Sequence, residues 1–287
     1  MDAETCGLSR QTGWSSDSSP EIRCPEFLPF RFCAIAARPI FVALLTATAS
    51  IADDPAKPKD IETDRPDVTP YTVPKGSIQL ESGVVWTDDE LSRALDFTES
   101  LLRISVSDGA EARVGVPTYF RNMGHHTPGS GFNDLLIGAK QRIASVAGFD
   151  LAIAPALSLP TGSKTRTSHG FDPQFEIPWQ RDITEGWSLS GTAGVFYLTE
   201  DGRRRTQGEN QIELEKDVNR RTDLFLEYQS FFGDGPVSNS LQMGGGYKIR
   251  PNHRLDFFVV VALSRAAPNL AVGIGYSFRL DRLLAKK

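Results

Sequence analysis

Histidines are the residues of this chain best suited to acid–base or metal chemistry, and their positions argue against both. His125 and His126 are adjacent in a stretch with glycine and proline, and adjacent histidines cannot easily reach one metal ion from a strand. His169 and His253 are expected in a loop and a turn, without a partner at metal-ligand spacing. None of the four falls inside an expected strand, where a serine–histidine pair would need one. We therefore expect no catalytic residue, no metal and no cofactor.

Cysteines and glycines add no site of their own. The only cysteines are Cys6, Cys24 and Cys33, so neither a disulfide framework nor a thiolate metal site is available after residue 33. Residues 244–246 are three glycines, but the helix that a phosphate-binding loop needs does not follow them. The run is typical of a strand position where bulk is unwelcome.

Charged residues at alternating positions are the remaining set with a chemical use. On one face of their segments they would line a narrow aqueous path or a solute pocket and tune its selectivity. Alternatively, opposite charges would pair across the interior and fill it. Both signs occur, so no preference for anions or cations follows. The set comprises Glu81, Glu111, Arg113, Lys140, Arg142, Asp150, Glu176, Glu213, Glu215, Glu227, Lys248, Asp256 and Arg279.

The elements that position these charges must be strands, because apolar residues also repeat with period two between residues 76 and 279. In 171–180, for example, Phe175 and Ile177 alternate with Gln174 and Glu176. Each such segment is about ten residues long, the length a tilted strand needs to cross a bilayer. Twelve segments are expected, near 77–87, 94–104, 110–120, 134–143, 149–159, 171–181, 187–198, 209–217, 223–232, 239–249, 254–263 and 270–279.

The second of these segments breaks the pattern. Asp96, Thr98 and Ser100 share one phase, but Glu99 and Arg103 fall out of it. We expect a bulge there, since one extra residue reverses the faces of all that follow.

Connections alternate between short and long. Turn-type residues make short connections at 107–109, 145–148, 184–186, 219–221 and 251–253. Longer or more polar loops are expected at 88–93, 121–133, 160–170, 199–208, 233–238 and 264–269, the fourth containing Arg203, Arg204 and Arg205. These arginines favour a solvated loop over a site for surface polysaccharide or anionic solute. Short turns at one end and longer loops at the other are typical of outer-membrane barrels.

Aromatic residues fall near the ends of the segments and predict two belts at the membrane interfaces. Near the short turns lie Trp179, Trp187, Tyr247, Tyr276 and Phe278; near the loops lie Trp86, Phe120, Tyr197 and Phe232.

A soluble β-sandwich or lipocalin-like barrel would also alternate, with its apolar face inward. Three features favour the membrane barrel. The polar face is rich in Gly, Ala and Ser, the strands are long, and a secretion signal precedes them. The predicted fold is all-β: an antiparallel up-and-down transmembrane barrel of about twelve strands.

The 75 residues ahead of this barrel divide into two parts. Arg31 and Arg38 precede a short apolar run that ends in small residues and is broken by Asp53, so 1–52 contains a secretion signal that we expect to be cleaved. Residues 53–75 carry five prolines and form a periplasmic lead-in, for which an exposed linker is favoured over a plug in the barrel mouth. The barrel is expected over 76–280 and a tail over 281–287.

Charge and hydropathy exclude other classes. A formal net charge of −5 without a basic stripe argues against nucleic acid. No apolar run approaches the roughly 20 residues of a membrane-spanning helix.

The sequence also resembles a known family. The motifs are Thr-Asp-Arg-Pro-Asp at 63–67, Pro-Lys-Gly at 74–76, Gln-Leu-Glu at 79–81, Leu-Leu-Ile-Gly-Ala-Lys at 135–140, Leu-Pro-Thr-Gly-Ser at 159–163 and Ala-Pro-Asn at 267–269. In this order, they resemble the outer-membrane family named for the MetA pathway of phenol degradation, over roughly 63–280. The resemblance implies a transporter-like barrel and supplies no site residue. The last strand resembles the terminal assembly signal of such barrels, although 280–287 extend past it.

We therefore expect a passive channel or transporter-like protein for small solutes, hydrophobic or aromatic ones among them, in the outer membrane of a Gram-negative-type envelope. Its expected partners are outer-membrane lipid and the barrel-assembly machinery. Two alternatives stay open: a closed structural or surface-interaction barrel, and a soluble periplasmic binding protein.

Overall fold

The computed structural model describes residues 60–65, 68–89, 93–124 and 129–283, and regular structure within them is β-strand throughout. The described residues contain no helix long and apolar enough to cross a membrane. The expected secretion signal and His125 and His126 lie outside these residues. The strands are β1 (Ile78–Asp88), β2 (Arg93–Phe97), β3 (Ser100–Ser107), β4 (Ala110–Val116), β5 (Tyr119–Asn122), β6 (Gly131–Phe132), β7 (Leu135–Val146), β8 (Phe149–Leu159), β9 (Asp172–Thr184), β10 (Trp187–Glu200), β11 (Arg203–Asn219), β12 (Thr222–Gly233), β13 (Ser238–Arg250), β14 (His253–Ala262) and β15 (Leu270–Leu280).

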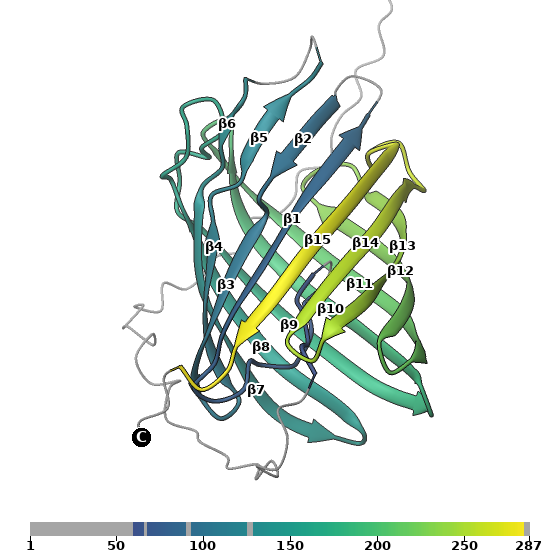
Figure 1. Cartoon of the computed structure of the whole chain (residues 1–287). Coiled ribbons are helices and arrows are strands. Elements are labelled where there is room, and N and C mark those ends of the chain that lie inside the picture. Colours follow the sequence, from purple (N-terminus) through teal and green to yellow (C-terminus); the bar gives the residue numbers. More distant parts are fainter. Residues whose placement is uncertain (1–59, 66–67, 90–92, 125–128, 284–287) are drawn as a thin grey trace, which may run out of the picture. The chain divides into compact units, whose positions relative to one another are not determined.

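The strands form one antiparallel sheet that closes on itself (Figure 1). Neighbours in sequence are neighbours in the sheet from β7 to β15, and the first strand pairs with the last along its whole length, from Ile78 opposite Leu280 to Asp88 opposite Leu270. Two of the predicted segments are each divided in two, as β2 with β3 and β4 with β5, and the short β6 lies in the stretch 121–133 that was expected to be a loop. The prediction of a closed up-and-down barrel of twelve strands is confirmed.

The division between β2 and β3 is the expected bulge. Val84 of β1 lies opposite Phe97, whereas Glu81 lies opposite Leu101, so four steps on one strand match three on the other. Thr98 has a positive φ of 52°, which marks the extra residue. Beyond it, the inward face of the strand changes phase.

Short turns join the strands at one end, as predicted, and each is accompanied by a register shift in its hairpin. Gly109 and Gly148 take φ values of +83° and +81° in two of these turns. Such values are strained for other residues, so glycine sets the turn geometry here.

Two expectations at the strand ends are wrong. Arg203, Arg204 and Arg205 lie in β11 and not in a loop, because β10 and β11 continue as a paired ladder to a connection of only Asp201 and Gly202. His253 is the first residue of β14 and not part of the turn, because its backbone already pairs opposite Arg250 of β13.

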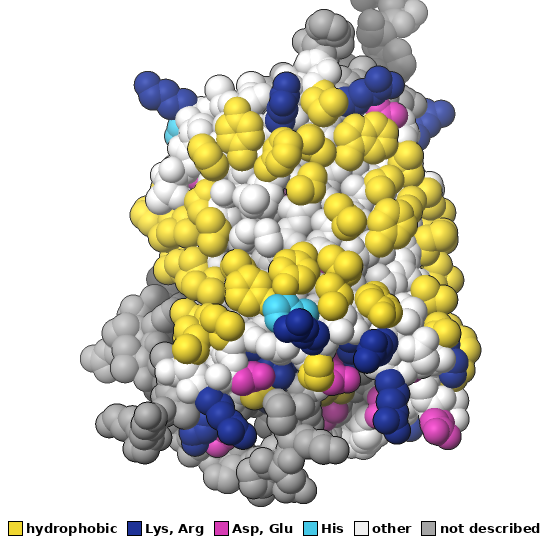
Figure 2. Space-filling view, viewed as in Figure 1, with side chains coloured by type: hydrophobic (Ala, Val, Ile, Leu, Met, Phe, Trp, Pro, Cys, Tyr) yellow, Lys and Arg dark blue, Asp and Glu magenta, His cyan; other side chains and the backbone are white. Residues whose placement is uncertain are grey.

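The two faces of the barrel differ as the period-two pattern predicted. Large apolar side chains such as Val195, Leu224, Phe257 and Ile274 are exposed on the outside. Figure 2 shows hydrophobic side chains as a broad band between two charged ends on the face in view. The inner face instead buries charged and polar side chains, among them Glu81, which is fully buried.

Residues 60–65 and 68–75, here called the lumen segment, lie inside the barrel, and the exposed linker favoured from the sequence is not found (Figure 1). Ile61 donates its backbone N–H to Pro251 in the turn between β13 and β14, and Thr192 of β10 donates to the carbonyl of Val68. Prolines do prevent a helix in this segment. Its chain stays extended inside the barrel because Ile61 and Val73 are buried and wall side chains satisfy its backbone groups.

Candidate functional site in the barrel interior

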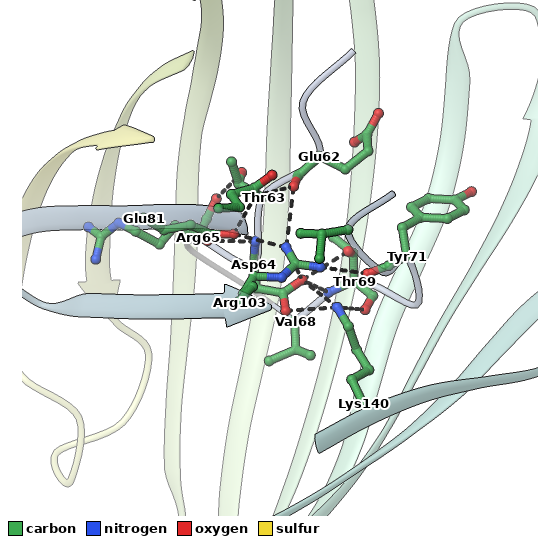
Figure 3. Close-up of polar contacts among 12 residues, drawn as sticks. Glu62, Thr63, Asp64, Arg65, Val68, Thr69, Tyr71, Glu81, Arg103 and Lys140 are labelled. Carbon is green, nitrogen blue, oxygen red and sulfur yellow. Dashed lines mark hydrogen bonds and ion pairs between the residues drawn. The ribbon is translucent and has the colours of Figure 1, made fainter. Parts of the chain in front are cut away.

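Arg103 of β3 lies at the centre of a charged cluster between the wall and the lumen segment (Figure 3). Its guanidinium donates to both carboxylate oxygens of Glu111 at 2.9 and 3.0 Å, and to Glu81 at 2.9 Å. It also donates to the backbone carbonyls of Glu62 at 3.2 Å and Tyr71 at 2.7 Å. One side chain therefore ties two wall carboxylates to two points on the lumen segment.

Asp64 is the charged group that the lumen segment contributes. Both of its carboxylate oxygens accept from Lys140 Nζ at 2.8 Å, and Arg113 and Arg103 lie 2.9 and 3.3 Å away. Burial alone would raise the pKa of Asp64, but the charges of Arg103, Lys140 and Arg113 outweigh it and hold the pKa well below its usual range. Asp64 is therefore ionised at neutral pH.

Backbone groups of the segment complete the cluster. The N–H groups of Asp64 and Val73 donate to Glu81 and Glu111, both at 2.8 Å. Lys140 also donates to the carbonyl of Thr69 at 2.9 Å. The cluster balances three carboxylates against three basic groups in a region where an unpaired charge would be costly: Asp64, Glu81 and Glu111 against Arg103, Arg113 and Lys140.

A second contact lies beside the bulge. Arg65 donates to the carboxylate of Glu99 at 2.8 Å and lies 3.6 Å from Asp256. Gly83 and Gly275 face each other across β1 and β15 and make room for this pair. A Cβ on Gly83 would lie 2.2 Å from Arg65, so a larger residue would displace the guanidinium.

A third contact lies at the short-turn end of β12 and β14. Arg254 of β14 and Asp223 of β12 form a bidentate pair at 2.7 and 2.6 Å. The carboxylate of Glu62 points toward this region, away from the Arg103 cluster, and its side chain is exposed within the barrel (Figure 3). Surrounding protein atoms raise the pKa of Glu62, and Lys248 and Arg254 partly offset that effect.

Apolar side chains also reach the interior. Val85, Phe225, Phe258 and Ala271 form a buried cluster on the inward face of β1, β12, β14 and β15, with Val260 packed against it. The interior thus presents charged, polar and apolar surfaces on different parts of its wall.

The predicted lumen residues divide between this site and other places. Glu81, Glu111, Arg113 and Lys140 meet in the Arg103 cluster. The others take part in separate contacts or lie apart: Asp256 faces Arg65, Arg279 pairs with Asp281, Arg142 lies 3.9 Å from Asp150, Glu213 accepts from Ser190, Glu227 accepts from Gln242, and Glu176, Glu215 and Lys248 lie elsewhere on the wall.

Phe120 is the exception among the predicted interface aromatics: it is buried on the inward side of β5, opposite Asp96 of β2, so the prediction was wrong for it. The other predicted interface aromatics lie on the outward positions of their strands. Trp187, Tyr197, Tyr247 and Tyr276 are exposed, while Trp86, Trp179 and Phe278 are half-buried. Two of the rings carry a cation on their face, Lys216 over Trp187 at 4.9 Å and Arg204 over Tyr197 at 5.1 Å. Their role as membrane anchors stays a prediction.

Three central residues were missed from the sequence. Arg103 was assigned to the outward face because the expected bulge before it was not used to shift the inward positions of the residues that follow. Asp64 and Arg65 were assigned to a linker because prolines surround them. Two acids and an arginine among prolines at 64–67 are the signal that could have pointed to a docked segment.

Comparisons with known proteins agree with this architecture. A family model described as "Putative MetA-pathway of phenol degradation" matches residues 63–280. The COG4313 outer membrane channel from Pseudomonas putida F1 is similar in structure, with a TM-score of 0.56 at 13% identity, over 80% of this chain and 100% of that one. The NanC porin is also similar, with a TM-score of 0.51 at 8% identity, over 71% of this chain and 100% of the porin. No curated protein matches the sequence.

Proposed function

Because this chain belongs to the family described as "Putative MetA-pathway of phenol degradation" and closes into a twelve-stranded barrel, we propose that it is an outer-membrane channel for the passive passage of small solutes. Passage requires neither catalysis nor a cofactor.

One observation carries the proposal: the polarity of the barrel is reversed relative to a soluble one. Phe257 and Ile274 are 51% and 59% exposed on the outside, whereas Glu81 and Lys140 are 0% exposed inside. Lipid solvates such an outer face, while water would make it an aggregation hazard. Solved structures of similar fold are titled as an outer membrane channel and a porin, which supports the same environment.

The interior supports small solutes over large ones. The lumen segment fills part of the cross-section, so a solute passes beside it. The apolar cluster of Val85, Phe225 and Phe258 offers a surface to hydrophobic or aromatic solutes among them.

Location and partners follow from the same proposal. The chain is exported by its cleaved N-terminal signal, lipid contacts the apolar band, and the barrel-assembly machinery recognises β15, where Tyr276 and Phe278 alternate with inward residues.

The test is to purify the exported chain and follow its membrane fraction, its gel mobility before and after heating, and its current in planar bilayers. We expect it in the outer-membrane fraction, with mobility that changes on heating and discrete current steps. A heat-modifiable barrel that never conducts would favour the closed structural alternative, and a chain soluble without detergent would contradict the membrane barrel itself.

A further inference from the structure

One part of the barrel wall carries acidic side chains and no basic ones. On β9 to β12, within residues 172–200 and 207–233, the described inward positions hold no lysine or arginine. The acids at the same positions are Asp172, Glu176, Asp182, Glu200, Glu209, Glu213, Glu215, Asp217, Asp223 and Glu227.

The basic residues of these strands lie elsewhere. Arg181 stacks on Phe149 and Lys216 on Trp187, both on the outward face. Arg204 pairs with Asp172 and Arg205 with Glu200 at the loop end of the barrel. Only this rim, and not the middle of the wall, receives their positive charge.

Most basic residues on the rest of the inner wall are engaged by acids, and Lys248, opposite Arg254, lies on β13 and so outside β9 to β12. Arg103, Arg113 and Lys140 are balanced within their cluster, and Arg254 is held by Asp223. Arg279 pairs with Asp281 at 2.6 Å. Lumen charges of both signs are therefore present in the sequence, but the positive ones are largely neutralised in the structure.

The lumen segment leaves the acidic wall facing the remaining space. Within the described residues, its hydrogen bonds and ion pairs reach strands from β1 to β8 and from β14 to β15, and touch this wall only at Thr192. Glu176 and Glu215 are half-buried and enter no ion pair among the described residues.

We infer that the path beside β9 to β12 selects cations over anions, a conclusion that rests on the proposed channel function. A wall of one sign in a narrow, low-dielectric passage concentrates counter-ions and repels ions of its own sign. The solutes it favours are small inorganic and organic cations.

The test is the reversal potential of the purified full barrel in planar bilayers under a KCl gradient, at low ionic strength where charges are least screened. We expect K⁺ to be several-fold more permeant than Cl⁻. In the variant with Glu176→Gln, Glu213→Gln and Glu215→Gln, we expect the ratio to fall toward one. If the triple variant does not fold, the single variants Glu176→Gln and Glu215→Gln should each lower the ratio of K⁺ to Cl⁻ permeability.

Glu185→Gln and Asp201→Asn are the matched controls, because each removes one acid from a connection outside this wall, and their ratio should equal that of the unmodified chain. A conducting barrel with a ratio at or below one overturns the inference and leaves the channel function standing. A ratio that the wall variants do not move also overturns it. A folded barrel that never conducts overturns both.

Discussion

Buried charges in this barrel are sustained at the level of single residues by partners of opposite sign. Arg103, with a side chain only 1% exposed, has three carboxylates and two carbonyls around it, so its desolvation is offset by charge-assisted hydrogen bonds. Removing one partner lowers the free energy of unfolding by more than the ion pair itself contributes, because the remaining charge stays buried without a partner.

The substitution Asp64→Asn tests how much the buried charge cluster contributes to stability. It leaves Lys140 and Arg113 short of a negative partner, and we expect the free energy of unfolding to fall by about 3–5 kcal/mol. Guanidinium unfolding of the refolded barrel measures this loss. Because the folded pKa of Asp64 is depressed, its contribution is fully present above the unfolded pKa of about 4 and is lost only as pH falls through the folded value. The loss should therefore be equal at neutral and mildly acidic pH.

Asp108→Asn is its matched control, since the Lys75–Asp108 pair is about 70% exposed on both sides. Its effect should stay within about 1 kcal/mol. Equal effects of the two substitutions would contradict the buried cluster.

The lumen segment is the element that determines how much of the interior is open. Replacing residues 60–75 by a flexible Gly/Ser linker of equal length should leave the barrel closed, because the β1–β15 ladder does not depend on it. We expect a larger single-channel conductance, measured in the same bilayers, because water and ions gain the space that the segment occupies.

The control for that replacement is the Asp108→Asn variant, which keeps residues 60–75 unchanged. An unchanged conductance in a folded, heat-modifiable linker variant would mean that the segment does not narrow the path.

At the level of elements, the strands were predictable and the segment was not. Period two locates strands and faces because strand side chains alternate strictly, and all twelve segments were placed from it. A bulge was expected near Glu99, but its consequence for Arg103 needs the register, which depends on pairing with β1. Docking of Asp64 and Arg65 depends on wall residues far along the chain, such as Lys140 and Asp256, and no local pattern encodes it.

At the scale of the whole molecule, the aromatic belts define where the bilayer should lie. Trp86 is near the loop end of the barrel and Trp187 near the short turns, both on outward positions. In variants that keep either Trp86 or Trp187 as the single tryptophan of the barrel, with Trp179 also replaced, lipids brominated near the headgroup should quench fluorescence more than lipids brominated near the chain end. Stronger quenching from the chain end would contradict the two belts.

The pairing of the first strand with the last has a consequence for how the segment is held. Residues 60–75 lead directly into β1, and Asp60 accepts a hydrogen bond from Arg279 of β15, so the segment's contacts are incomplete without the final strand. Residues of β15 therefore both close the barrel against β1 and contact the segment, so a change that loosens this strand weakens the closing ladder and the hold on the segment together.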